Sequence, residues 1–394
     1  MSGRLVILFS VSLLLISTPG MVTSAADDHI PKKYLPIYRE LENQLTLTEN
    51  TLNGKQTQSS KTTFAIELLV ADGQRGEILL SERARVGTIL TLDGVKVLGI
   101  TGVSFSIPYP LLSAKSSRYQ EYQRFYKEMI TEAKKRGFKV MVELGSFFPE
   151  PEFSPIRHDY SKETLQTIET GLINMGKVIT DYGPDYLSLP AEPDTFERNV
   201  GIKMSDGDWG TMIEKIAGEL NGKHTKIGAG AGTWSPISLF QKLAGIDALD
   251  FLNIHIYPIQ RDYFAPKVSE IAGLTNKQKK ALIVGEAWLY KVGESALGAK
   301  VAGSPISFAR DAYSFWEPLD ARFIENMIRL SRIFKIEYCS FFWMRNFFAY
   351  LDYDQVAEQP PDAVFKAINT KAAPNVIQGI PNDLGLILRK MIQK

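Results

Sequence analysis

The sequence is poor in cysteine and has no long apolar run. Its single cysteine, Cys339, excludes an intrachain disulfide, so the fold must be stabilised by its own core, which 394 residues allow. A membrane-spanning helix needs about 20 apolar residues. The stretch from Leu5 to Ile16 is too short for that. We therefore expect no stable membrane anchor.

The sequence also lacks the motifs of several enzyme classes. Its four histidines show no i, i+4 pairing and no cysteine cluster exists, so we predict no metal site. A Gly-x-Ser-x-Gly elbow is absent. The glycines at 228, 230 and 232 do not have the spacing of a dinucleotide loop, and we interpret them as a tightly packed strand end, so no cofactor is expected. The net charge of +1 does not favour nucleic acid as a partner.

The amino end has the order of a secretory signal peptide. Arg4 is followed by the short apolar stretch and then by small residues from Thr23 to Ala26. We expect residues 1–25 to be removed and the protein to be secreted or periplasmic. Residues 26–61 are interpreted as an N-terminal leader and linker, with an amphipathic helix over 31–49 that packs on the floor of the main domain. Residues 62–394 are expected to form one catalytic domain with C-terminal helices, acting as a monomer.

Beyond residue 61, short β-branched runs alternate with helical stretches. The predicted strands are 63–70, 101–106, 139–144, 186–189, 226–229, 251–256, 281–285 and 338–343. Predicted helices cover 119–136, 163–180, 209–220, 237–243 and 322–334, each with an apolar stripe. Strands separated by helices form parallel sheets with right-handed crossovers. Eight such units predict an α/β fold, a (β/α)8 TIM barrel in a single domain.

Two glutamates follow predicted strands at their carboxyl ends. Glu192 comes after the fourth strand and Glu286 after the seventh. In a parallel barrel these strand ends share one face, where side chains from distant positions converge. Glycoside hydrolysis uses such a pair of carboxyls. One protonates the leaving oxygen, and the other attacks the sugar or activates water.

Four landmarks in this order resemble clan A of the retaining glycoside hydrolases, and in particular its cellulase- and mannanase-like members. They are Glu192-Pro193, His255-x-Tyr257, Gly285-Glu286 with Trp288, and Trp343. The resemblance spans residues 62–354. It implies a (β/α)8 barrel with Glu192 as acid/base and Glu286 as nucleophile. The clan's asparagine before the acid/base is Ala191 here, and no early barrel arginine is located, although Arg345 and Asn346 could substitute for it.

The chemistry asks for different ionisation states of the two glutamates. Glu192 needs a raised pKa to hold a proton, whereas Glu286 must be ionised, with a hydrogen bond from Tyr257 or His255 favouring its carboxylate. The remaining predicted substrate-binding residues are Trp288, Trp343, Trp234, Glu143 and Arg345, of which the tryptophans offer flat faces for sugar C–H groups.

Structural alternatives exist for these residues. Glu192 could be a helix-start acid, because Pro193 also suits a helix beginning. His255 could be a core histidine, Glu143 a salt-bridge partner, and the tryptophans core residues.

We predict an exported hydrolase of β-linked oligo- or polysaccharides that uses two glutamates with retention. The alternatives are a carbohydrate-binding barrel that has lost catalysis, which Ala191 motivates, and a barrel enzyme of other chemistry that needs a metal.

Overall fold

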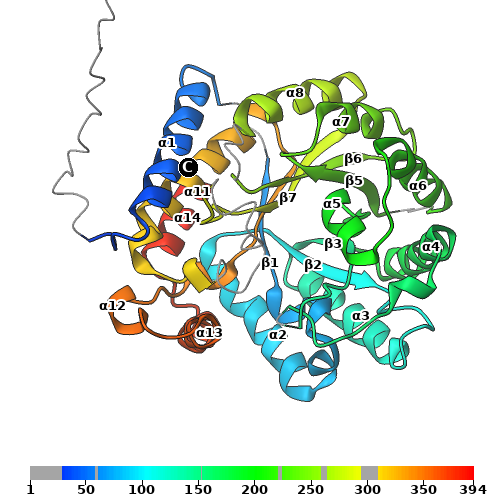
Figure 1. Cartoon of the computed structure of the whole chain (residues 1–394), viewed down its shortest axis with the longest axis horizontal. Coiled ribbons are helices and arrows are strands. Elements are labelled where there is room, and N and C mark those ends of the chain that lie inside the picture. The colour runs from blue at the N-terminus through cyan, green and yellow to red at the C-terminus, as the bar shows by residue number, and fades with distance from the viewer. Residues whose placement is uncertain (1–28, 58–60, 152, 221–223, 259–263, 294–308) are drawn as a thin grey trace, which may run out of the picture.

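Eight parallel strands close on themselves in chain order, each hydrogen-bonded to the next and β8 to β1. The computed structural model describes residues 29–57, 61–151, 153–220, 224–258, 264–293 and 309–394 (Figure 1). The strands are β1 (Thr63–Glu67), β2 (Gly102–Tyr109), β3 (Lys139–Ser146), β4 (Tyr186–Ser188), β5 (Lys226–Gly232), β6 (Phe251–Ile256), β7 (Ala281–Ala287) and β8 (Tyr338–Phe341). All eight predicted strands are present, and the predicted (β/α)8 TIM barrel is confirmed.

Helices surround this barrel (Figure 1). They are α1 (Leu35–Leu52), α2 (Glu82–Gly94), α3 (Tyr119–Lys135), α4 (Leu165–Tyr182), α5 (Pro193–Val200), α6 (Asp206–Glu219), α7 (Ile237–Ala244), α8 (Phe264–Lys277), α11 (Glu317–Phe334), α12 (Tyr353–Val356), α13 (Pro361–Gln378) and α14 (Asp383–Gln393). Short 3-10 turns include η3 (Gly73–Leu80) and η7 (Met344–Phe347). Each predicted helix is found within a few residues of its expected bounds.

The leader helix α1 packs against α8 and α11 in the outer layer, rather than on the barrel floor as expected. Arg322 of α11 donates to both carboxylate oxygens of Glu49 in α1, which fixes that contact. The predicted signal peptide lies outside the described residues. Within the part of the chain that is described, no helix is long and apolar enough to cross a bilayer.

The barrel interior is arranged in layers. Alternate residues of a strand point inward, and one inward set forms an apolar layer made of Ala65, Met141, Tyr186, Phe251, Ile283 and Tyr338. Two residues beyond Tyr186 and Tyr338 lie Ser188 and Ser340, and Ser340 is hydrogen-bonded at 2.9 Å to Ser104 of β2. This stacking fills the lower barrel, and in such barrels ligands bind at the carboxyl ends of the strands.

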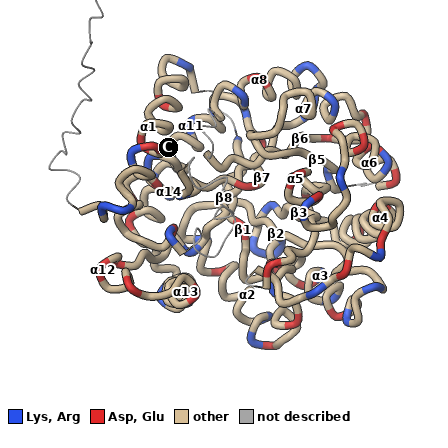
Figure 2. Tube along the Cα trace, in the orientation of Figure 1, with Lys and Arg blue, Asp and Glu red and all other residues tan. Residues whose placement is uncertain are grey.

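The glycines of β5 allow close packing inside the barrel. A Cβ on Gly230 would lie 1.4 Å from the carbonyl oxygen of Asn253, and one on Gly228 would lie 2.2 Å from the Phe251 ring. This confirms the interpretation of the glycine run as a tightly packed strand segment. Basic and acidic residues are interspersed along the outer helices (Figure 2).

Candidate active site

The two predicted catalytic glutamates are brought to the same end of the barrel. Glu192 follows β4 and stands immediately before α5, which begins at Pro193. Its side chain does not cap that helix, and instead accepts a hydrogen bond from the Thr195 hydroxyl at 2.7 Å. Glu286 lies in β7 with His255 of β6 as its neighbour in the sheet. Each carboxyl is partly exposed, as a group that meets a ligand must be.

His255 connects three carboxyls. Its Nδ1 lies 2.9 Å from Glu192 Oε1 and 3.7 Å from Glu286 Oε2, and its Nε2 lies 3.1 Å from Glu143 Oε1. The ring is 2% exposed. Burial alone would lower the pKa of His255, but the charges of Glu143 and Glu286 and the hydrogen bonds to Glu143 and Glu192 raise it well above its usual value. His255 is therefore an imidazolium that donates from both nitrogens, rather than a core histidine.

Asn253 holds Glu143 in place from below. Its side-chain amide donates to Glu143 Oε2 at 2.8 Å and to the Ser188 hydroxyl at 2.9 Å, and its carbonyl accepts from the Gly285 backbone at 2.7 Å. Glu143 thus contacts both Asn253 and His255. The structure joins the predicted Glu143 to the site as the third carboxyl of the His255 network.

Tyr257 contacts Glu286 directly. Its hydroxyl donates to Glu286 Oε2 at 2.6 Å. The two residues belong to neighbouring strands, since Tyr257 directly follows β6 and Glu286 is the penultimate residue of β7. The expected hydrogen bond from Tyr257 to Glu286 is present.

The expected ionisation states of the two glutamates are reversed. Burial would raise the pKa of Glu192, but the hydrogen bond and charge of His255, with the Thr195 hydroxyl, lower it overall. Burial raises the pKa of Glu286 to about 8, since the repulsion of Glu143 and Glu192 adds to burial and outweighs the opposing effects of His255 and Tyr257. The physical reason is position: His255 contacts Glu192 more closely than Glu286. The proton of this pair therefore lies mainly on Glu286.

Only one of the three predicted tryptophan platforms lies at the glutamates. Trp234 is partly exposed, donates from Nε1 to Asp194 at 3.1 Å, and has its ring centroid 6.2 Å from that of Tyr257. Trp288 is fully buried, with its ring edge-on to Phe347 at 6.1 Å, so the prediction of a sugar platform there is wrong. The chain beyond β7 turns this ring into the core.

Trp343 and Arg345 form a buried cluster. The Arg345 guanidinium lies 4.1 Å from the Trp343 ring and 4.4 Å from the Phe365 ring. Trp343 and Arg345 are 5% and 4% exposed, respectively. Asn346 is also buried, and its amide donates to the Asp311 carbonyl at 3.0 Å. Burial and cation–π packing engage both side chains, and the binding of substrate by Trp343 and Arg345 stays a prediction.

Among the described residues, Glu143, His255 and Glu286 could converge on a metal ion. One ligand atom from each lies within 4.8 Å of the others. However, Nδ1 and Nε2 of His255 each lie close to a carboxylate oxygen, at 2.9 and 3.1 Å, so a metal ion on this ring would have to displace a proton and break one of these contacts. This donor set fits an imidazolium network better than a metal centre, and the expectation of a metal-free site stays a prediction.

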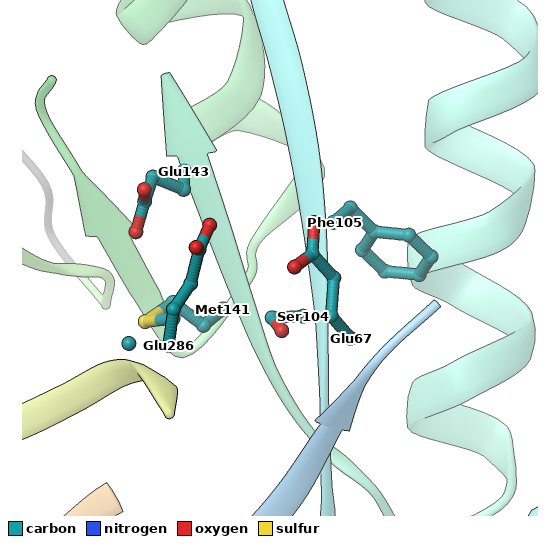
Figure 3. Close-up of a pocket in the computed structure, with 7 residues that line it drawn as sticks. Glu67, Ser104, Phe105, Met141, Glu143 and Glu286 are labelled. Carbon is teal, nitrogen blue, oxygen red and sulfur yellow. The ribbon is translucent and has the colours of Figure 1, made fainter. Parts of the chain in front are cut away.

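Several site residues were missed by the sequence analysis. Asn253 lies one inward position below His255, so the two-residue period of a strand could have found it, whereas Ser188 is the last residue of β4, four positions before Glu192. Glu67, at the end of β1, was interpreted only as part of a strand. It lines one small space with Glu143 and Glu286, and Figure 3 shows its carboxyl directed toward Glu286.

Comparison of sequences identifies no relative. No family model matches the chain, and no curated protein matches it.

Comparison of folds does find matches among solved glycoside hydrolases. Two are structures of GH5_18 proteins from Bifidobacterium longum. The one from subspecies infantis has a TM-score of 0.54 and 11% identity over 84% of this chain and 78% of that chain. The one from subspecies longum, solved in complex with Manβ1-4GlcNAc, has a TM-score of 0.52 and 12% identity with the same coverage.

A third match is the exo-β-1,4-mannosidase Op5Man5 from Opitutaceae bacterium strain TAV5. It has a TM-score of 0.50 and 11% identity over 83% of this chain. The chain spans 61% of the length of that mannosidase. What the three share with this chain is the barrel fold, the fold of the clan whose motifs the sequence resembles. Such a fold carries many activities, so function has to be argued from the site.

Proposed function

We propose that the chain is a β-glycoside hydrolase that acts with retention, with Glu286 as the nucleophile and Glu192 as the acid/base. The fold is shared with glycoside hydrolases, and the site supports this chemistry through one observation. Two carboxyls from β4 and β7 face the same nitrogen of His255, at 2.9 Å for Glu192 and 3.7 Å for Glu286.

These distances limit how far apart the two glutamates are. The facing oxygens cannot be separated by more than the sum of the two distances to His255 Nδ1. That limit lies at the short end of the spacing of about 6.5 to 9.5 Å at which inverting enzymes admit a water, and it is compatible with the spacing of about 5 to 5.5 Å of retaining enzymes. The geometry therefore favours direct attack by a glutamate over attack by water.

In the proposed reaction, Glu192 gives a proton to the glycosidic oxygen while Glu286 attacks the sugar carbon and displaces the leaving group. Glu192, now a carboxylate, then takes a proton from water, which attacks the same carbon and releases Glu286. Tyr257 stabilises the Glu286 carboxylate before attack and after release, through its hydrogen bond of 2.6 Å. His255 stabilises the Glu192 carboxylate between the two steps.

One proton must first change places. The resting site holds it on Glu286, whereas attack needs it on Glu192. His255 Nδ1 faces both carboxyls. It can pass its own proton to Glu192 and take the proton of Glu286, which leaves the imidazolium unchanged. The reactive arrangement is then a minor form of the singly protonated pair, and its population sets the rate.

The charge of the site argues for a neutral substrate. With Glu286 holding a proton, the carboxylates of Glu143 and Glu192 still outnumber the single His255 imidazolium, so a uronic acid or a sulfated sugar would be repelled. We propose a neutral β-linked oligo- or polysaccharide as the substrate. We also propose that the protein is exported as a monomer, which fractionation of the native host and light scattering would test.

The test is release of reducing sugar from mannans, β-glucans, galactans, xylans and chitin. Wild-type protein should act on at least one of these, and folded Glu286→Ala protein on none. Glu192→Ala should lose more activity on natural glycosides than on activated aryl glycosides, because a good leaving group needs little protonation. Equal loss on both substrate types would contradict the role of Glu192. Tight binding of one polymer without any release would instead identify a carbohydrate-binding barrel.

A further inference from the structure

Glu67 is a fourth carboxyl of the site, and the reaction described above does not use it. It is the last residue of β1, two positions after Ala65 of the apolar layer, and its partner in the sheet is Ser104. The side chain is 3% exposed. Figure 3 draws the Glu286 carboxyl between the carboxyls of Glu143 and Glu67, and all three line one space.

The three carboxyls differ in their partners. Glu143 accepts from Asn253 and contacts the His255 imidazolium, and Glu286 accepts from Tyr257. The buried Glu67 Oε2 has no hydrogen-bond donor among the described residues. The space that it faces is too small for a water molecule. A buried carboxylate oxygen without a donor is costly, and such a group commonly takes up a proton instead.

The charges that face Glu67 also favour its protonated form. Glu286 of β7, Glu143 of β3 and Asp72, which precedes η3, are acidic, and His255 of β6 is the cation that opposes them. Burial, followed by the repulsion of Glu286, Asp72 and Glu143, raises the pKa of Glu67 well above its usual value. Tyr257 and Tyr338 also face Glu67. Burial raises the pKa of both phenols well above the usual value, so both are uncharged at neutral pH.

We propose that Glu67 is a positioning residue for Glu286, with a protonated carboxyl that donates toward Glu286 from the side opposite Glu143. This inference rests on the proposed hydrolase function. A neutral donor at this position stabilises the Glu286 carboxylate in the reactive arrangement. A charged Glu67 would repel it. In this role Glu67 acts through the hydrogen bond that it donates to Glu286 and not through a charge. Glu67→Gln keeps such a donor, whereas Glu67→Ala removes it.

The kinetic test compares Glu67→Ala with Glu67→Gln on the best substrate of the polysaccharide panel. Glu67→Ala should lower kcat about tenfold or more with little change in KM, while Glu67→Gln should stay within about threefold of wild type, because the amide still donates. Thermal unfolding checks that both variants are folded. Equal losses in both variants would mean that the charge or the acid itself is needed. No loss in either would mean that Glu67 does not position Glu286. Both results overturn the proposal.

A second test does not depend on activity. Infrared difference spectra at pH 7 between wild type and Glu67→Gln should show one protonated carboxylic acid band that the variant lacks. Glu77→Gln, which changes an exposed carboxylate of η3, is the control and should not remove such a band. Absence of the band refutes the protonated state. So does binding of one Zn²⁺ or Mn²⁺ per chain that Glu67→Gln abolishes, because the carboxyl would then be a metal ligand.

The two tests separate the two proposals. If no polymer is cleaved but the infrared band is present, the proposed hydrolysis fails while the protonated Glu67 stands. If polymer is cleaved and the band is absent, hydrolysis stands and the present inference fails.

Discussion

Replacing Tyr257 by phenylalanine removes one hydrogen bond from the proposed nucleophile and leaves the ring in place. In the structure the Tyr257 hydroxyl donates to Glu286 Oε2 at 2.6 Å. Burial and the neighbouring carboxyls already raise the pKa of Glu286 to about 8, and this hydrogen bond opposes them. Its loss should therefore raise that pKa further, because the carboxylate form of Glu286 loses a donor while the protonated form loses little.

The size of the effect follows from the strength of such a bond. A hydrogen bond to a charged group contributes about 1.5 to 3 kcal/mol, and the lower figure is about one pKa unit, or a factor of ten. In a pair that shares one proton, the reactive arrangement with ionised Glu286 should then become about tenfold rarer. We expect kcat/KM at the pH optimum to fall about tenfold.

The pH profile gives a second readout. Activity should fall at low pH when the pair takes up a second proton, and at high pH when the last proton leaves. The high-pH limb reports the proton held mainly on Glu286, so in Tyr257→Phe it should move up by about one unit. The assay measures kcat/KM from about pH 4 to about pH 10, which covers both limbs of the profile. The control is Tyr119→Phe, at the start of α3. A limb that stays in place or moves down would refute the reasoning.

Three further predictions concern other parts of the chain. Lys291→Met should lower the free energy of unfolding by about 3 to 5 kcal/mol in denaturant titration, because it leaves the buried Asp311 and Asp320 without their cation; Lys177→Met, at an exposed ion pair, should change it little. Gly230→Ala should reduce the yield of folded protein seen by circular dichroism, since its Cβ would meet a backbone oxygen. Treatment with EDTA should leave hydrolysis unchanged, and lost activity that Zn²⁺ restores would contradict the metal-free mechanism.

The fold was predictable because its signals are local. β-Branched runs and apolar helical stripes marked all eight strands and the main helices of the barrel. Helices with a weak stripe were missed, among them α2, whose Thr88, Thr91 and Gly94 are buried beside few large apolar residues. Strand ends were also placed less well, as β2 and β5 each extend three residues beyond their expected ends.

The site was predictable where a residue follows a strand end. Glu192, Glu286, His255 and Tyr257 were located in this way, and the structure brings their side chains together. The aromatic platforms were less predictable. Trp234 and Trp288 both follow strands, yet the first is partly exposed beside Tyr257 and the second is fully buried, because loop conformation decides where a ring points.

By itself the sequence determined the order of strands and helices and the two glutamates at the carboxyl ends of β4 and β7, because spacing along a chain fixes which residues share a face. Only the tertiary structure decided which of the acidic side chains in the site hold a proton. Closure of the barrel places His255 nearer to Glu192 than to Glu286 and buries Glu67 beside three acids. A pKa depends on distances and burial in space, and no pattern along a chain contains these.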